Sequence, residues 1–119
     1  MLQTAMTKLN LQATAADENG YTLLHAAAAY NQRSVMEFLL QQQSNPNAQD
    51  NEGDTPLHHV DQVEAAKFLI EVAGANPKIT NTESKTALQA KQDELRDQME
   101  DDEDDVEDLK HLVNYLQTR

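Results

Sequence analysis

The sequence predicts an all-α repeat solenoid, a row of similar helical units stacked side by side. The first reason is that a ten-residue segment beginning at Asp17 returns 33 residues later at Asp50 with the same layout. A looser third copy begins at Asn81. The second reason is that an aromatic residue followed by two aliphatic residues recurs at 38–40 and 68–70. Self-similarity at this period is typical of stacked repeats, in which each unit buries its apolar face against its neighbour.

Each copy has the composition of a turn that leads into the start of a helix. In the second copy, Gly53 can adopt a positive φ, so the chain can reverse there. Thr55 suits the N-cap, and Pro56 suits the first helical position, where its missing N–H costs nothing. Leu57 then begins an apolar face. The copies therefore predict where each helix pair begins.

The pattern G-x-T-P-L-H at residues 53–58, repeated at this period, resembles the ankyrin repeat, a β-turn followed by two antiparallel helices. The first copy has leucine in place of proline, and the third has Ser84 in place of glycine and Gln89 in place of histidine. The resemblance extends from about Asp17 to Leu116. Two short segments of the sequence are also similar to short stand-alone ankyrin proteins of fungi.

This resemblance implies a single domain of about three repeats. The expected units, in chain order, are an incomplete N-terminal repeat or capping helix at 1–16, repeat 1 at 17–49, repeat 2 at 50–80 and repeat 3 at 81–119. Leu2, Met6 and Leu9 recur at helical spacing, so we expect the N-terminal segment to cover the apolar side of the first full repeat.

The first two repeats should differ in the length of their inner helix. Repeat 1 predicts an inner helix over 23–31 and an outer helix over 34–43. The span from His58 to Leu69 in repeat 2 is three residues shorter than the span from His25 to Leu39 in repeat 1. This difference predicts a short inner helix over 56–60 in repeat 2. Its outer helix is expected over 62–73, with Gly74 as the C-cap.

The third repeat should carry an acidic insertion between its helices. Residues 87–99 contain strong helix formers and no breaker, and the last helix is expected over 106–117. Six consecutive acids at 100–105 should repel one another and stay solvated. If Ser84 takes a left-handed conformation, we expect a cost of about 1 kcal/mol.

The charge of the chain excludes one class of ligand. The formal net charge is −12, and residues 93–108 alone hold eleven acids against Arg96. The rest of the chain is nearly neutral. Binding of phosphates needs a basic surface, so we expect no direct nucleic-acid ligand.

The lack of cysteine and of a long apolar run bears on where in the cell the protein is expected. The sequence contains no cysteine, and its longest apolar run, at 23–30, is far too short to span a bilayer. We expect no membrane contact, a monomeric state, and a cytoplasmic and/or nuclear location.

Histidines and acids in the repeats raise the question of a metal or catalytic site. In ankyrin repeats the histidine of this motif bonds to the neighbouring turn, and the resemblance implies that role for His25 and His58. His59, Asp61 and Glu64 could be considered as metal ligands, but a polar exposed face is the simpler interpretation. A calcium loop at 100–108 would need a glycine that is not there. We predict no metal, cofactor or catalytic residue, and therefore no enzyme.

The function predicted is non-enzymatic binding of a partner protein on the concave surface of turn tips and inner helices. Phe38, Phe68 and Tyr115 are expected in the core instead. The candidate binding residues are Asn19, Tyr21, Tyr30, Glu52, Asp54, His59, Asp61, Glu83 and Lys85. The alternative is an acidic escort or chaperone for a basic client, such as a ribosomal protein or histone, that uses the insertion at 93–108.

Overall fold

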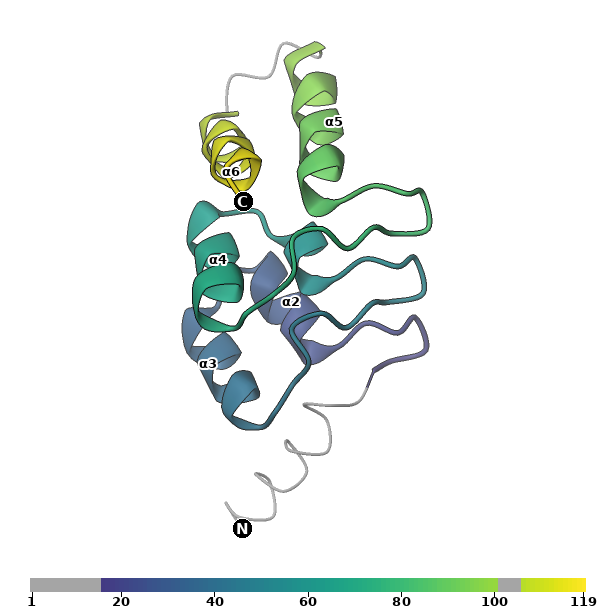
Figure 1. Ribbon diagram of the computed structural model, residues 1–119, viewed down its shortest axis with the longest axis vertical. Helices are drawn as coiled ribbons and strands as arrows, with labels where there is room; N and C mark the ends of the chain where they lie inside the picture. Colours follow the sequence, from purple (N-terminus) through teal and green to yellow (C-terminus); the bar gives the residue numbers. More distant parts are fainter. Residues whose placement is uncertain (1–15, 101–105) are drawn as a thin grey trace.

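The computed structural model describes residues 16–100 and 106–119, which form a row of stacked turns and helices (Figure 1). The turns that begin at Asp17, Asp50 and Asn81 project from the same side, and the helices lie behind them. This arrangement is the all-α solenoid that the repeats predict. The predicted N-terminal helix and residues 101–105 of the predicted acidic run lie outside the described residues.

The first repeat contains α2 (Leu23–Ala29) and α3 (Arg33–Gln41). Both helices end two residues earlier than predicted, so the expected ends at 31 and 43 are wrong. The cause is that Asn31 has a φ of 54° and Gln43 a φ of 66°. A left-handed residue cannot continue a right-handed helix. Asparagine adopts this conformation more readily than most non-glycine residues, so Asn31 carried a stop signal that the prediction missed, whereas Gln43 carried none.

The second repeat confirms the short inner helix but not the continuous outer one. The inner element is η1 (Pro56–His59), a single 3₁₀ turn. The outer element, expected as one α-helix over 62–73, consists of α4 (Val63–Lys67) followed by a π-helical turn, η2 (Phe68–Val72). A π turn inserts a residue into the helical ladder, and such an insertion leaves no clear mark on apolar spacing.

The third repeat contains α5 (Ala87–Glu100) and α6 (Glu107–Gln117), close to the predicted bounds. Ser84 has a φ of 64°, so it adopts the left-handed conformation expected at the glycine position. The ammonium of Lys85 lies 2.6 Å from a carboxylate oxygen of Asp93, which ties the turn to the side of α5.

The core is shared between neighbouring repeats. α2 packs against α3 and η1, η1 packs against α5, and α4 packs against α6. The largest fully buried apolar side chains come from all three repeats: Leu24, Met36, Leu39, Leu57, Leu69 and Leu112. Phe68 is buried, and Phe38 and Tyr115 pack partly buried against the same core, as predicted. The helices in the described ranges are too short or too polar to cross a lipid bilayer.

Gly53 and Gly74 have nearly the same backbone conformation but different surroundings, so substituting each in turn tests how closely the turns stack. Their φ values are +78° and +77°. A Cβ at Gly53 would lie 2.8 Å from the amide nitrogen of Thr82, whereas one at Gly74 would meet no described atom within 4 Å. We expect Gly74→Ala to lower the free energy of unfolding by about 1 kcal/mol, the conformational penalty alone. Gly53→Ala should cost at least twice as much, because the third turn must also move.

Urea denaturation followed by circular dichroism measures both losses. Equal losses for the two variants would contradict the close approach of the second and third turns.

Candidate functional site

The turns share one pattern of internal hydrogen bonds, which is set by an aspartate or asparagine at their first position. In the second turn, the amides of Glu52 and Asp54 both donate to Oδ1 of Asp50 at 2.9 Å. Asp17 and Asn81 accept the corresponding pairs of bonds in the other two turns. Because one side-chain oxygen is sufficient for this role, an aspartate keeps a second oxygen for other partners.

Neighbouring turns are also joined to each other by backbone bonds. The amide of Asn51 donates to the carbonyl of Asn19 at 2.8 Å, and the amide of Thr82 donates to the carbonyl of Glu52 at 3.0 Å. The side-chain amide of Asn51 donates to the carbonyl of Glu18 at 2.9 Å. These bonds hold the turn tips at a fixed spacing.

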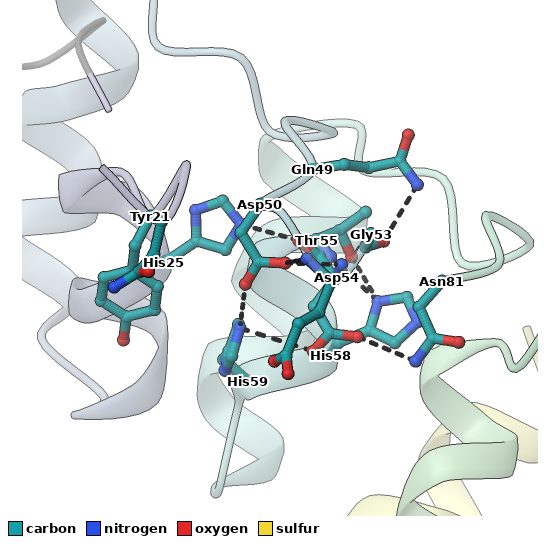
Figure 2. Close-up of polar contacts among 12 residues, drawn as sticks. Tyr21, His25, Gln49, Asp50, Gly53, Asp54, Thr55, His58, His59 and Asn81 are labelled. Carbon is teal, nitrogen blue, oxygen red and sulfur yellow. Dashed lines mark hydrogen bonds and ion pairs between the residues drawn. The ribbon is translucent and has the colours of Figure 1, made fainter. Parts of the chain in front are cut away.

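The motif histidines have the structural role that the resemblance implies. Nδ1 of His25 accepts a bond from the amide of Thr22 at 3.1 Å, so the ring proton is on Nε2. Nε2 then donates to the carbonyl of Asp54, in the next turn, at 2.8 Å. His58 makes the same contacts one repeat later, with Nε2 3.0 Å from the carbonyl of Lys85. Figure 2 shows both imidazoles between the turns.

Gln89 performs half of this role in the third repeat. Its Oε1 accepts a bond from the backbone amide of Thr86 at 2.9 Å, and the backbone amide of Gln89 donates to the Thr86 hydroxyl at 3.2 Å. The side-chain oxygen therefore caps the start of α5. In the described part of the chain it bonds to no further turn.

A cavity of about 440 Å³ lies between the first and second turns and is called the interturn hollow below. The side chains that line it combine carboxylates, amides, a phenol and an imidazole: Asp17, Asn19, Tyr21, Asp50, Asn51, Glu52 and His59. They come from two successive turns and from η1. Only the stacking of the repeats therefore brings them together.

Three aromatic rings pack together beside this hollow. The centre of the Tyr21 ring lies 5.3 Å from the centres of both the His25 and the His59 rings, and the two imidazoles are 5.4 Å apart. The Tyr21 and His59 rings meet edge to face, which is one of the arrangements that aromatic pairs prefer. Burial raises the pKa of the Tyr21 hydroxyl, so the phenol is neutral at physiological pH.

Asp50 connects the turn to the rings. Its Oδ2 lies 3.0 Å from Nε2 of His59, and Figure 2 shows the two side chains pointing toward each other. Burial alone would raise the pKa of Asp50, but bonds from His59 and from the amides of Asp54 and Glu52 outweigh it and hold the pKa below the usual value. The carboxylate is therefore charged at neutral pH.

The convergence of His25, Asp50 and His59 suggests a metal site, which the sequence did not predict. Their ligand atoms lie within 4.8 Å of one another. Within the described residues, His59 therefore converges with His25 and Asp50, and not with the Asp61 and Glu64 considered from the sequence.

The chemistry of His25 does not fit a metal ion. A metal ligand needs a ring nitrogen with a free lone pair. Nδ1 of His25 already accepts from Thr22, and Nε2 carries the proton that bonds to Asp54. A metal at this position would have to break the bonds that join the first two turns.

Similarity to known proteins agrees with the stacked-repeat fold. A family profile for ankyrin repeats, in three copies, matches residues 2–81, which is more than half of the chain. The chain belongs to the ankyrin-repeat family. The match begins inside the segment predicted as an incomplete first repeat and ends at Asn81, the first residue of the third turn.

Two similar proteins are much longer than this chain. An ankyrin repeat-containing protein of Schizosaccharomyces pombe is 36% identical over 75 residues, which are 63% of this chain and 36% of that protein. A homologue of the transient receptor potential cation channel subfamily A member 1, from Caenorhabditis elegans, is 42% identical over 57 residues. Those residues are 48% of this chain and 5% of that channel protein. The chain therefore spans about a third of the first relative and a small part of the second.

The ankyrin stack brings some of the predicted binding residues together and separates others. Four of them line the interturn hollow: Asn19, Tyr21, Glu52 and His59. Asp54 turns toward the third turn, where its Oδ1 accepts a bond from Nδ2 of Asn81 at 2.9 Å. Its carboxylate is thus mainly a link between turns.

The remaining predicted residues lie elsewhere on the repeats. Tyr30, at the end of α2, is 73% exposed. Asp61 follows η1 and is exposed, as is Glu83 on the third turn. Lys85 is bonded to Asp93, so its charge is largely neutralised.

Sequence reasoning missed Asp17, Asp50 and Asn51 as residues of the hollow. The repeat spacing could have identified the two aspartates. Asp17 and Asp50 lie 33 residues apart at the same position of adjacent turns, so a stacked array must place them side by side.

The buried His25 gives a testable dependence of stability on pH. Burial lowers its pKa despite the bond to the Asp54 carbonyl, which acts in the opposite direction. Below the usual pKa of 6.5 the unfolded chain binds a proton at His25 that the folded chain rejects. Its contribution to stability is therefore complete above that pH and is lost as the pH falls toward the lowered value.

We compare the wild type with His25→Gln, which keeps a cap like that of Gln89 but loses the bond to Asp54. At pH 7.5 the variant should be less stable by about 1–3 kcal/mol. The difference should shrink between pH 6.5 and 5.5, as urea denaturation at each pH would measure. Since Asp50 titrates below its usual value of 3.8, it does not contribute in this range. A difference that stays constant across these pH values would contradict a buried neutral His25.

Proposed function

We propose that this ankyrin-repeat chain is a non-enzymatic adaptor that binds a partner protein on its concave surface. Ankyrin repeats are in general protein–protein interaction modules. The proposed surface consists of the turn tips and the inner helices, with the interturn hollow at its centre. It includes the residues that the sequence selected, apart from the structural Asp54 and the ion-paired Lys85.

The observation that supports this proposal is the contrast between backbone and side chains at the turn tips. The backbone of each tip is bonded within its own turn and to a neighbouring turn. The side chains of Asn19, Glu52 and Glu83 on those tips are nevertheless exposed. A surface whose backbone is already ordered loses little conformational entropy when a partner binds.

The chemistry of the same surface supports a non-enzymatic role. A nucleophile or general base needs a reactive lone pair within reach of a substrate. The buried imidazole of His25 has both nitrogens in structural bonds, and His59 faces the carboxylate of Asp50. The imidazole of His25 is therefore engaged in joining the first two turns, and that of His59 in a contact within the second repeat.

Site-specific photo-crosslinking in cells tests the proposed surface. A photo-reactive amino acid is placed at position 30 or 52 on the concave side, and at position 64 or 72 as matched controls. Glu64 and Val72 are exposed on the outer elements α4 and η2, and Figure 1 shows α4 on the side away from the turn tips. We expect one and the same protein to be captured from positions 30 and 52 and not from positions 64 and 72.

Capture from the outer positions alone would show that the partner uses the opposite face. The absence of any protein captured at 30 or 52 would overturn the proposal.

The acidic escort is the second candidate, and its support is the charge of −10 confined to residues 93–108. Some of the described acids in this segment already have cationic partners: Asp93 bonds to Lys85, and Glu94 lies 3.6 Å from the buried Lys91. An escort should lose its basic client when residues 100–105 are deleted, and the loss should be largest at low salt. An adaptor that uses the concave surface should keep its partner after the same deletion.

A further inference from the structure

The lining of the interturn hollow carries negative charge that no basic side chain in it balances. Its lining includes the carboxylates of Asp17, Asp50 and Glu52 and contains no lysine or arginine. Within the described residues, no donor bonds to Oδ2 of Asp17 or to the carboxylate of Glu52. The Asp17 and Glu52 side chains are both exposed, so their charges are available to a partner.

The hollow also has an aromatic surface of defined orientation. The ring of Tyr21 is half-buried and packs against both the His25 and the His59 imidazoles, with ring centres 5.3 Å from each. A cation that lies over such a ring interacts favourably with its π electrons. The ring is fixed because His25 is fully buried and bonded on both nitrogens.

We propose that the interturn hollow receives the guanidinium of an arginine from the partner protein, between the Asp17 and Glu52 carboxylates and against Tyr21. This inference rests on the proposed adaptor function and adds the chemistry of the partner to it. Charge complementarity selects a cation, and the combination of carboxylates with a flat ring favours arginine over lysine. A guanidinium is planar, forms paired bonds with carboxylates and stacks on aromatic rings, whereas an ammonium is a compact, strongly hydrated charge.

The size and position of the hollow agree with this occupant. The volume of about 440 Å³ accommodates a whole side chain rather than a single ion. A bare metal ion is disfavoured because His25 has no nitrogen to offer and Asp50 is bonded to His59. The hollow opens between the first two turn tips, so an extended segment of a partner can lie across the tips and insert one side chain.

The test variant removes two charges and keeps the fold. It carries Asp17→Asn together with Glu52→Gln. The asparagine retains the oxygen that accepts the turn bonds, as Asn81 does in the third turn. The matched control carries Glu64→Gln and Asp97→Asn, which remove two exposed charges from outside the hollow. Circular dichroism and urea denaturation establish that both variants are folded.

The probe is a phage-displayed library of random 12-residue peptides, selected on the full wild-type chain. We expect the selected peptides to be enriched in arginine over its frequency in the library. The best peptide is then synthesised with arginine, with lysine and with citrulline, which has nearly the shape of arginine but no charge. Fluorescence anisotropy measures its affinity for each protein.

The expected result is a loss of affinity of about tenfold or more, both for the charge-removed variant and for the citrulline peptide. The lysine peptide should fall in between, the control variant should bind like the wild type, and added salt should weaken binding. No enrichment of arginine, or equal affinity of the wild type and the charge-removed variant, would overturn the inference.

The design separates failure of this inference from failure of the adaptor function. Peptides that lack arginine but lose affinity on Tyr30→Ala would overturn the inference while leaving the concave surface in use. Peptides that respond to no concave-side substitution, together with absent crosslinks at positions 30 and 52, would overturn both.

Discussion

The bond from a buried imidazole to the carbonyl of the next turn is the interaction on which the rest of this structure depends. His25 and His58 each start a helix with one ring nitrogen and hold the following turn with the other. A neutral histidine suits both tasks because it offers one acceptor and one donor on opposite sides of a rigid ring. The third repeat shows the consequence of losing the histidine, since Gln89 caps its helix but holds no further turn in the described part of the chain.

The interturn hollow is a by-product of this stacking. A turn needs one oxygen of its first aspartate, and the stacking places the second oxygens of successive turns on a common surface. In the second turn that oxygen meets His59, and in the first it is exposed. The same geometry that stabilises the array therefore also gathers negative charge at its tips, which is a reason to examine such surfaces for basic partners.

Most of the fold could be predicted from the sequence, because the repeat exposes the same physical requirements several times. The glycine or serine that must be left-handed, the capping threonine and the apolar landmarks all lie at one period, and the structure places them as expected. The errors lie where no repeated signal exists. Gln43 stops a helix through a backbone conformation that glutamine rarely adopts, and Asn31 does so through one that asparagine only sometimes adopts. The π turn over 68–72 changes the hydrogen-bond ladder without changing which residues are apolar.

The sequence by itself determined the architecture, the role of the two histidines and the surface on which binding residues were sought. The architecture follows from local chemistry repeated at a fixed interval, and the role of the histidines from the resemblance of that repeat to the ankyrin motif. Only the tertiary structure decided which of those residues meet. It brought Tyr21, Glu52 and His59 into one hollow, turned Asp54 toward Asn81, and neutralised Lys85 with Asp93. Such pairings depend on side-chain direction across repeats, which residue spacing along one chain does not specify.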